Sequence, residues 1–241
     1  MQSPIQLIEN EITRYHGVQT LERAIAFWMG ACRHSLLRQW LERDDDTSIQ
    51  LTRDLLFSAA RSSFGVMLAK MVRTVPESKR LKTVSMRPNP RVAENETLLH
   101  CAAKADNPEA IKLLFSLLPE SEHLLAVCLL DNQGRTVLHS AANSKNPETA
   151  QTLATLLPES EKQISNSQDR YGYTVLHFAA YRGNSDLLKT FLPIYPESRR
   201  LQVVSKQNRM GMNVFQCAIR SGSVCIEAIM NLYPNRNVRR L

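Results

Sequence analysis

The sequence has no apolar stretch long enough to cross a membrane. Its longest uninterrupted apolar run, residues 24–32, has nine residues, far below the roughly 18–20 that a spanning helix needs. The acidic residues Glu9, Glu11 and Glu22 precede this run and make it a poor core for a signal peptide. We therefore expect neither a membrane span nor a cleaved leader.

The sequence also lacks the short motifs of the common enzyme classes. It contains no G-x-x-x-x-G-K-[ST], G-x-G-x-x-G, H-E-x-x-H or G-x-S-x-G segment, so phosphate-binding loops, dinucleotide sites, zinc proteases and hydrolase elbows have no local support. Its 5 cysteines are widely spaced and include no C-x-x-C pair, which argues against a zinc or redox site. They predict buried thiols in a reducing compartment such as the cytoplasm.

The sequence does contain enough apolar material for a soluble folded core. Of its 241 residues, 43% are hydrophobic and 22% are charged, which excludes collagen, a coiled-coil rod and a wholly disordered chain. The net charge of +7 is uneven: residues 199–241 hold eight basic residues against one acidic, whereas residues 96–198 hold eight against twelve. We expect the basic C-terminal end, with Arg236, Arg239 and Arg240, to be a solvated tail; a nucleic acid or an anionic membrane surface is the alternative partner there.

A seven-residue segment recurs along the chain and organises it. Its copies begin at Asp54, Thr97, Thr136, Thr174 and Asn213. The three central copies carry a histidine at the same place, 39 and 38 residues apart: His100, His139 and His177. A second marker, Pro-Glu-Ser, keeps the same register at Pro76, Pro119, Pro158 and Pro196. Two independent markers in one register indicate a repeat protein.

Each unit has the pattern of two helices. The residue that begins each copy has a short polar side chain that can accept a hydrogen bond, which predicts the N-cap of a first helix. That helix is expected to end about seven residues later, at residues that tolerate the left-handed conformation of a tight turn: Asn107, Asn146, Gly183 and Gly222. Two of these are followed by a proline suited to open a second helix: Pro108 and Pro147. Apolar residues at helical spacing predict the buried face of that helix: Ile111, Leu114, Phe115 and Leu118.

A further segment follows the second helix of each unit. The serines of Pro-Glu-Ser are predicted to cap a short third turn of helix: Ser78, Ser121, Ser160 and Ser198. This segment accounts for the period of 38–39 residues. Turn sequences then lead to the next first helix: residues 131–134, 169–172 and 208–211.

These features resemble the ankyrin-repeat family, whose signature is a D-x-x-G-x-T turn followed by P-L-H-x-A-A and two antiparallel helices. The resemblance covers roughly residues 47–241 and is specific in the three central units. The sequence departs from the signature where Val or Leu replaces the proline, where Asn95 replaces the turn glycine, and where Phe57 and Gln216 replace the histidine. The resemblance implies an all-α solenoid of about five helix-turn-helix units. Units of 38–39 residues with Pro-Glu-Ser are similar to the elongated repeats of effector proteins of intracellular bacteria, which implies an effector acting inside a host cell.

The recurring histidines suggest a metal or catalytic site, but the repeat argues against both. Equivalent positions lie one repeat apart, so they cannot close on one ion whose ligands sit at about 2.0–2.1 Å. In the resembled family this histidine joins neighbouring turns through hydrogen bonds, which implies the same structural role here. We expect no catalytic residue, no metal and no cofactor.

Residues 1–46 do not show the repeat and are predicted to form an N-terminal helical cap. Their apolar residues fall on one helical stripe: Leu21, Ile25, Trp28, Cys32 and Leu36. The end of a solenoid needs a cover, so we expect these helices to pack on the first unit of the repeat domain, residues 47–241. A helix that binds a partner is the alternative.

The resemblance implies a non-enzymatic module that binds a partner protein through the concave face and turn tips, and we expect a monomer. The positions that the family uses for binding, transferred residue by residue, give the predicted site: Arg135, Arg170, Tyr171, Tyr173, Tyr181, Arg182, Arg209, Met210 and Met212. Tyrosine, arginine and methionine are side chains that supply hot spots and adaptable contacts. Packing of Tyr171 and Tyr173 on neighbouring turns is the alternative. The other functional class considered is an enzyme whose pocket joins Cys32 and His34 to the repeats.

Overall fold

A computed structural model describes the greater part of the repeat domain. The described residues are 56–57, 60, 77–87, 95–144, 146–158, 164–222 and 225–231. Within these ranges the regular structure is helical and contains no strand, and no helix there combines the length and apolarity of a membrane span. The predicted N-terminal cap, the N-cap at Asp54 and the basic end at residues 236–240 lie outside the described residues.

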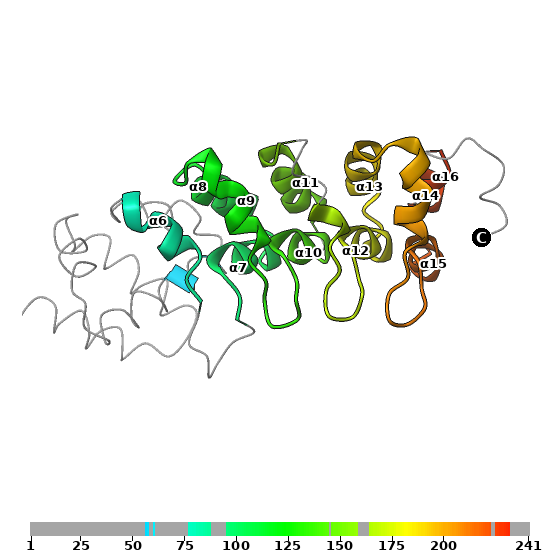
Figure 1. Cartoon of the computed structure of the whole chain (residues 1–241), viewed down its shortest axis with the longest axis horizontal. Helices are drawn as coiled ribbons and strands as arrows, with labels where there is room; N and C mark the ends of the chain where they lie inside the picture. Colours follow the sequence, from blue (N-terminus) through cyan, green and yellow to red (C-terminus); the bar gives the residue numbers. More distant parts are fainter. Residues whose placement is uncertain are drawn as a thin grey trace, which may run out of the picture. The chain divides into compact units, whose positions relative to one another are not determined.

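The helices form two rows and a third set that joins them (Figure 1). The first helices of the units form one row: α7 (Leu98–Lys104), α10 (Val137–Ala142), α12 (Val175–Arg182) and α15 (Val214–Arg220). The second helices form the other: α8 (Pro108–Phe115), α11 (Pro147–Leu156), α13 (Ser185–Phe191) and α16 (Cys225–Asn231). The third helices are α6 (Glu77–Val84), α9 (Glu120–Cys128) and α14 (Glu197–Ser205), and the 3-10 helix η2 (Leu192–Ile194) precedes α14.

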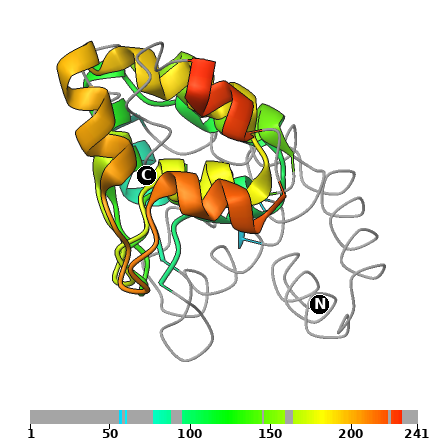
Figure 2. The same cartoon turned by 90° about the vertical axis from the view of Figure 1, so that its right-hand side faces the viewer.

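Helices of each row pack on their neighbours in the same row. Contacts join α7 to α10, α10 to α12 and α12 to α15, and likewise α8 to α11, α11 to α13 and α13 to α16. Seen from its end, the stack superposes the loops of successive units (Figure 2). Neighbouring units therefore repeat one arrangement, as a solenoid requires.

The core lies between the two rows. The paired alanines of the first helices are fully buried and let adjacent helices approach closely: Ala102, Ala103, Ala141, Ala142, Ala179 and Ala180. Both rows supply the larger buried side chains: Leu98, Leu99, Leu138 and Leu176 from first helices, and Ile111, Leu114, Phe115, Leu153, Leu187 and Phe191 from second helices. Burying one such large side chain contributes about 1.5–3 kcal/mol. The helical spacing in the sequence predicted the buried face of the second helices correctly.

The predicted N-caps of the first helices are confirmed in the described units. Each cap is reciprocal: the side chain of the cap residue faces the backbone of the third helical residue, whose own side chain accepts from the cap N–H. The pairs are Thr97 with His100, Thr136 with His139, Thr174 with His177, and Asn213 with Gln216. The recurring histidine therefore helps to start the helix on which it lies.

The prediction of a left-handed conformation is wrong at two of the four residues. Asn107 and Asn146 have φ angles of −108° and −93°, and each is the N-cap of a second helix, with its side chain accepting a backbone N–H. In the first of these units it is Asp106, one residue earlier, that has a positive φ of 56°. An asparagine side chain satisfies either position, so composition alone does not separate them. Gly183 and Gly222 do adopt positive φ, as predicted.

The capping role predicted for the Pro-Glu-Ser serines is also wrong for Ser78, Ser121 and Ser198, whereas Ser160 lies outside the described residues. The N-cap residues of α9 and α14 are Pro119 and Pro196, and neither helix has a side-chain cap hydrogen bond. Ser121 and Ser198 lie inside the first turn of those helices. The third segment is a helix of 8 or 9 residues in three units and not a single turn. Glutamate at the first helical position instead stabilises the positive end of the helix dipole.

Candidate protein-binding surface

Three turns of the stack are built on one buried side-chain acceptor each. Oδ1 of Asp131, Asp169 and Asn208 accepts the backbone N–H groups two and four residues ahead, at 2.8–3.0 Å. These three residues are 4–6% exposed. Each turn also contains a glycine at φ between 72° and 79°, and the backbone path through a turn follows from this acceptor and that glycine. The turn sequences were predicted correctly.

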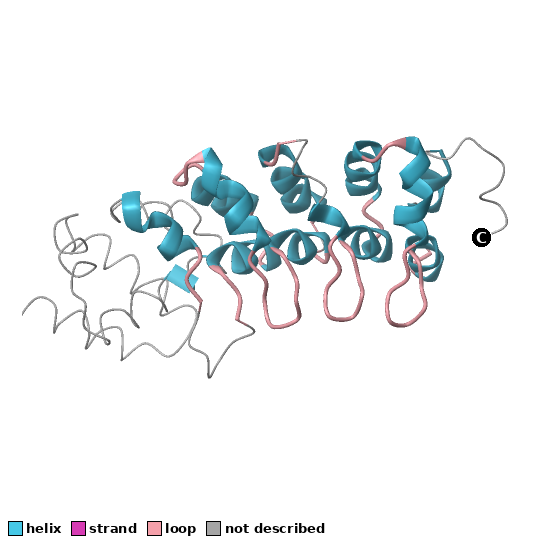
Figure 3. Ribbon diagram, viewed as in Figure 1, coloured by secondary structure: helices cyan, strands magenta, loops and turns pink. Residues whose placement is uncertain are grey.

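Backbone hydrogen bonds join each turn to the next. The N–H of Arg170 donates to the carbonyl of Gln133 at 2.8 Å, and the N–H of Arg209 donates to the carbonyl of Tyr171 at 2.8 Å. The loops consequently line up along one side of the stack (Figure 3). Because these bonds use only backbone atoms, the side chains along this edge can vary without breaking the connection.

The three histidines add a second connection between units. Nδ1 of each accepts the N–H of its own cap threonine at 3.1–3.3 Å, which leaves Nε2 as the protonated nitrogen. Nε2 of His100 donates to the carbonyl of Arg135, that of His139 to those of Ser167 and Tyr173, and that of His177 to that of Met212, at 3.0–3.2 Å. The role that the family resemblance implied for these histidines is confirmed.

Burial keeps these histidines neutral. Desolvation lowers the pKa of His139 and of His177 to about 4, and it also lowers the pKa of His100. Each ring uses both nitrogens in structural hydrogen bonds, so it has no lone pair left for a metal or a substrate. Among the described residues no group of three His, Cys, Asp or Glu side chains could hold a metal ion.

The nine predicted site residues fall into two groups. Six are exposed: Arg170, Tyr171, Tyr181, Arg182, Arg209 and Met210. Three are half-buried and face the stack: Arg135, Tyr173 and Met212. Exposure reaches 52% for Tyr171, 45% for Tyr181 and 68% for Met210. The exposed group lies on the turns of two adjacent units and on the last residues of α12.

The half-buried residues support the exposed ones. The Arg135 guanidinium lies 5.0 Å from the centre of the Phe178 ring, and its Nε pairs with Asp169 Oδ2 at 3.3 Å. The Tyr173 ring also stacks on Phe178, with the ring centres 5.1 Å apart, and its hydroxyl donates to Met210 Sδ at 3.3 Å. Tyr173 therefore packs on a neighbouring turn, which is the alternative that its sequence left open.

Arg182 is held in place by the unit before it. Its Nε donates to Oδ1 of Asn143 at 3.1 Å, and its guanidinium lies 5.8 Å from the centre of the Tyr181 ring. On α15, Nη1 of Arg220 contacts Met212 Sδ at 3.7 Å. A guanidinium that is already positioned loses less side-chain entropy when it binds a partner.

Sequence reasoning missed one exposed apolar residue on the first helices. Ile219 is 53% exposed, although the equivalent Ala142 and Ala180 of the preceding units are fully buried. The signal was present in the sequence, because Ile219 interrupts the paired alanines in the last unit. The row of first helices ends at α15 within the described residues, so no following first helix covers Ile219, and Gln216 is exposed there too, whereas the equivalent His177 is buried.

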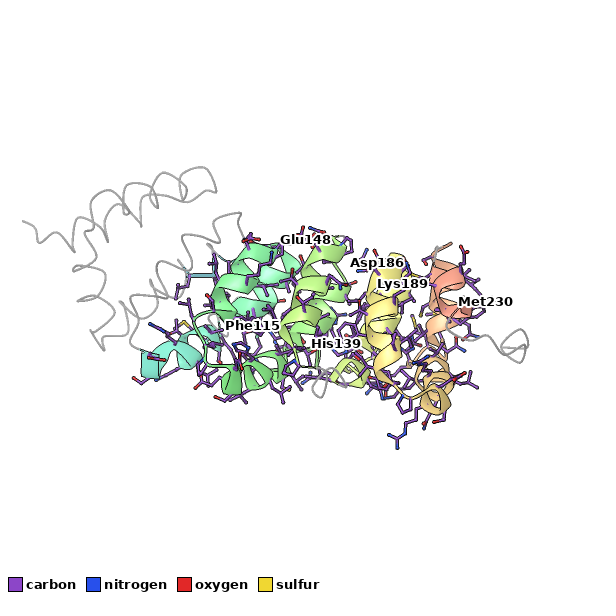
Figure 4. The ribbon with its side chains drawn as sticks, turned by 90° about the horizontal axis from the view of Figure 1, so that it is seen from above. Phe115, His139, Glu148, Asp186, Lys189 and Met230 are labelled. Atoms are coloured by element: carbon purple, nitrogen blue, oxygen red, sulfur yellow. The ribbon has the colours of Figure 1, made fainter. Side chains whose placement is uncertain are left out.

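The second helices present a different surface. An open groove of about 460 Å³ between α11 and α13 is lined by Pro147, Glu148, Gln151, Asp186, Lys189 and Thr190. Figure 4 shows Glu148 on α11 and Asp186 and Lys189 on α13. Lys189 pairs with Asp186 at 3.1 Å on the exposed surface, and this groove offers no convergent set of catalytic groups. The pocket considered for an enzyme involves Cys32 and His34, which lie outside the described residues.

A stack of short helix pairs with loops on one side defines the class of helical repeat proteins. The ankyrin-repeat family matches the chain in two stretches: a three-copy ankyrin profile over residues 56–165 and a single ankyrin repeat over residues 171–195. The chain belongs to the ankyrin-repeat family, and its fold is an all-α ankyrin solenoid. The comparison with curated proteins finds no relative of the chain. Beyond the matched residues, α15 and α16 continue the same helix pair.

Proposed function

We infer from its ankyrin repeats that this chain is a protein-protein interaction module. We propose that this chain is a non-enzymatic module that binds a partner protein through the turns and first helices of its last three units. The observation that supports this most strongly is the exposed set Tyr171, Tyr181, Arg182 and Met210. Tyr171 and Met210 lie on adjacent turns that a backbone hydrogen bond joins, and Tyr181 and Arg182 end α12. We name this set, together with Arg170, Arg209, Ile219 and Arg220, the turn-edge surface.

The composition of the turn-edge surface suits binding. Tyrosine and arginine are the side chains enriched among interface hot spots, and methionine adapts to irregular partners. Exposed apolar side chains scattered singly are normal on a soluble protein, but here several lie on adjacent turns and helices. Backbone hydrogen bonds join the turns that carry Tyr171 and Met210, and the other side chains lie on helices, so binding would not have to order the backbone beneath them.

Replacing Tyr171 and Arg182 together by alanine should abolish capture of the partner from cell lysate with little change in stability. Both side chains are exposed and neither stacks in the Phe178 cluster, so we expect the melting temperature to stay within about 2 °C of that of the parent. Binding should weaken about tenfold or more. Quantitative mass spectrometry of the captured proteins and a thermal melt provide the two measurements.

Two further variants serve as controls for this experiment. Lys112→Ala with Lys189→Ala changes exposed side chains on α8 and α13 and should retain every captured protein. Tyr173→Ala with Arg182→Ala should lower the melting temperature as well, because Tyr173 stacks on Phe178 and bonds to Met210. Equal capture by the parent and by the Tyr171→Ala, Arg182→Ala variant would contradict the proposed surface.

The finer points of this proposal concern where and how the module acts. We propose an effector that acts inside a host cell, because the units of 38–39 residues contain an additional helix after Pro-Glu-Ser. We also propose a reducing compartment, supported by the wide spacing of the 5 cysteines and their lack of a C-x-x-C pair, and we propose a monomer. A fusion to a calmodulin-dependent adenylate cyclase tests delivery: cyclic AMP in host cells supports it, and enzyme retained in the producing cell contradicts it. Sedimentation equilibrium tests the monomer.

A further inference from the structure

We propose that the turn-edge surface recognises an acidic protein segment, in which Asp or Glu residues flank an aromatic or aliphatic side chain. This inference rests on the proposed function and names the chemistry of its partner. It follows from three features of the surface: where its cations lie, where its acids lie, and which apolar side chains lie between them.

The cations of this surface are all arginines. The turns and first helices of the last three units, residues 131–143, 169–182 and 208–221, contain five: Arg135, Arg170, Arg182, Arg209 and Arg220. Four of them are exposed, and Arg135 is the half-buried one. The guanidinium group carries its charge at every physiological pH and can bind a carboxylate with two parallel hydrogen bonds. Several arginines on one surface therefore favour an anionic partner.

The acidic residues of the same three segments are withdrawn from the surface. The segments contain only two, Asp131 and Asp169, which are 4% and 6% exposed. Oδ1 of each accepts two backbone N–H groups inside its own turn, and Oδ2 of Asp169 also pairs with Arg135. The exposed arginines consequently have no exposed acid beside them in these segments, so their field is directed at a partner.

The row of second helices does not share this arrangement of exposed cations without exposed acids. The second helices carry exposed residues of both signs, including the pairs Glu109 with Lys112 and Asp186 with Lys189. Such mixed surfaces attract neither sign strongly. An acidic partner would therefore be drawn to the turn-edge surface and not to the second helices.

The apolar side chains favour a protein over a nucleic acid. Tyr171, Met210 and Ile219 are each more than half exposed and lie on the same turns and helices as the arginines. Contacts to phosphates use positive charge, and bases stack on flat aromatic rings. Methionine and isoleucine provide no such ring, but they do pack well against an aliphatic or aromatic side chain of a peptide. A segment with both carboxylates and an apolar residue matches both features.

Selection from a random peptide library displayed on phage tests this inference, because the enriched peptides themselves reveal the chemistry that the surface prefers. The full chain is used as bait in parallel with two variants of equal formal charge. In one, Arg170→Glu and Arg209→Glu reverse two exposed cations of the turn-edge surface, whose backbone N–H groups keep their bonds to Gln133 and Tyr171. In the other, Lys112→Glu and Lys189→Glu reverse two exposed cations of the second helices.

We expect the parent and the lysine variant to enrich peptides rich in Asp and Glu with at least one aromatic or aliphatic residue. The arginine variant should lose these peptides about tenfold or more, and raising the salt from about 0.05 M to about 0.5 M should weaken their binding to the parent. Neutral or basic peptides, enriched equally by all three baits, would overturn the acidic chemistry while leaving protein binding intact. Failure to enrich any peptide, or tighter binding of a single-stranded oligothymidylate, would also overturn the inference.

The proposed function has its own readout, which separates the two results. Loss of lysate capture in the Tyr171→Ala, Arg182→Ala variant depends on the location of the site and not on the charge of the partner. If that loss is observed and the selected peptides are not acidic, the site stands and its proposed chemistry is wrong.

Discussion

Lowering the pH from about 7.5 to about 5 should cost the protein about 4 kcal/mol of unfolding free energy, because two buried histidines resist protonation. Burial lowers the pKa of His139 and of His177 from 6.5 to about 4, and the neighbouring Asp169 offsets part of that effect in both. In the unfolded chain both rings become protonated below about pH 6.5. In the folded protein they stay neutral until about pH 4.

The sign of this effect follows from the direction of the shifts. A histidine with a lowered folded-state pKa contributes stability that is complete above the unfolded value of 6.5 and is lost as the pH falls toward 4. At about pH 5 each of the two rings has lost about 2 kcal/mol. His100 adds to the loss in the same direction, since burial also lowers its pKa. Urea unfolding at several pH values measures the total.

Glutamine provides a matched control for this prediction. In the last unit Gln216 occupies the histidine position, and its Oε1 accepts the Asn213 N–H at 2.9 Å. His177→Gln should therefore keep the helix cap but remove one titrating group, so the loss of stability between about pH 7.5 and about pH 5 should shrink by about 2 kcal/mol. An identical pH dependence in the parent and in His177→Gln would show that protonation of this ring does not limit stability.

The sequence alone predicted the structural features that depend on residues close together in the chain. A threonine three residues before a histidine, followed by paired alanines, predicted the cap, the first helix and the row of buried small side chains. The D-x-x-G pattern predicted the turns, because an Asx acceptor and a residue at positive φ define them locally. The threonine, histidine and paired alanines recur in all three central units and the D-x-x-G turn in two of them, so repetition strengthened each prediction.

It was harder to predict which side chains are buried, because burial depends on the residues of other elements that pack against them. Tyr171 and Tyr173 both belong to one turn, yet Tyr171 is exposed whereas Tyr173 is half-buried. The difference arises at Phe178, which stands where the other units have Cys101, Ser140 and Cys217. Its ring provides a platform that draws in Tyr173 and Arg135. A bulky residue at a position otherwise occupied by small ones was the signal in the sequence, but only the fold shows what packs on it.

The connection between turns makes Gly172 the most sensitive glycine of the turn-edge surface. Gly172 has φ of 79° and Gly211 has φ of 74°, so alanine at either site must adopt the left-handed conformation, which costs about 1–2 kcal/mol. At Gly172 the added Cβ would also lie 3.0 Å from the Arg209 nitrogen and 3.0 Å from Asn208 Cα, whereas at Gly211 it would meet nothing within 4 Å. Backbone atoms cannot rotate away, so the neighbouring turn must shift.

We therefore expect Gly172→Ala to destabilise the protein by about 3 kcal/mol and Gly211→Ala by about 1 kcal/mol, measured by urea unfolding at neutral pH. The difference isolates the contact between turns, because the backbone strain is nearly the same at both sites. Gly172→Ala should also weaken partner binding under conditions where it remains folded, since Arg209 and Met210 lie on the turn that must move. Equal losses of stability in the two variants would mean that neighbouring turns can separate at little cost, and the turn-edge surface would then not be rigid before it binds.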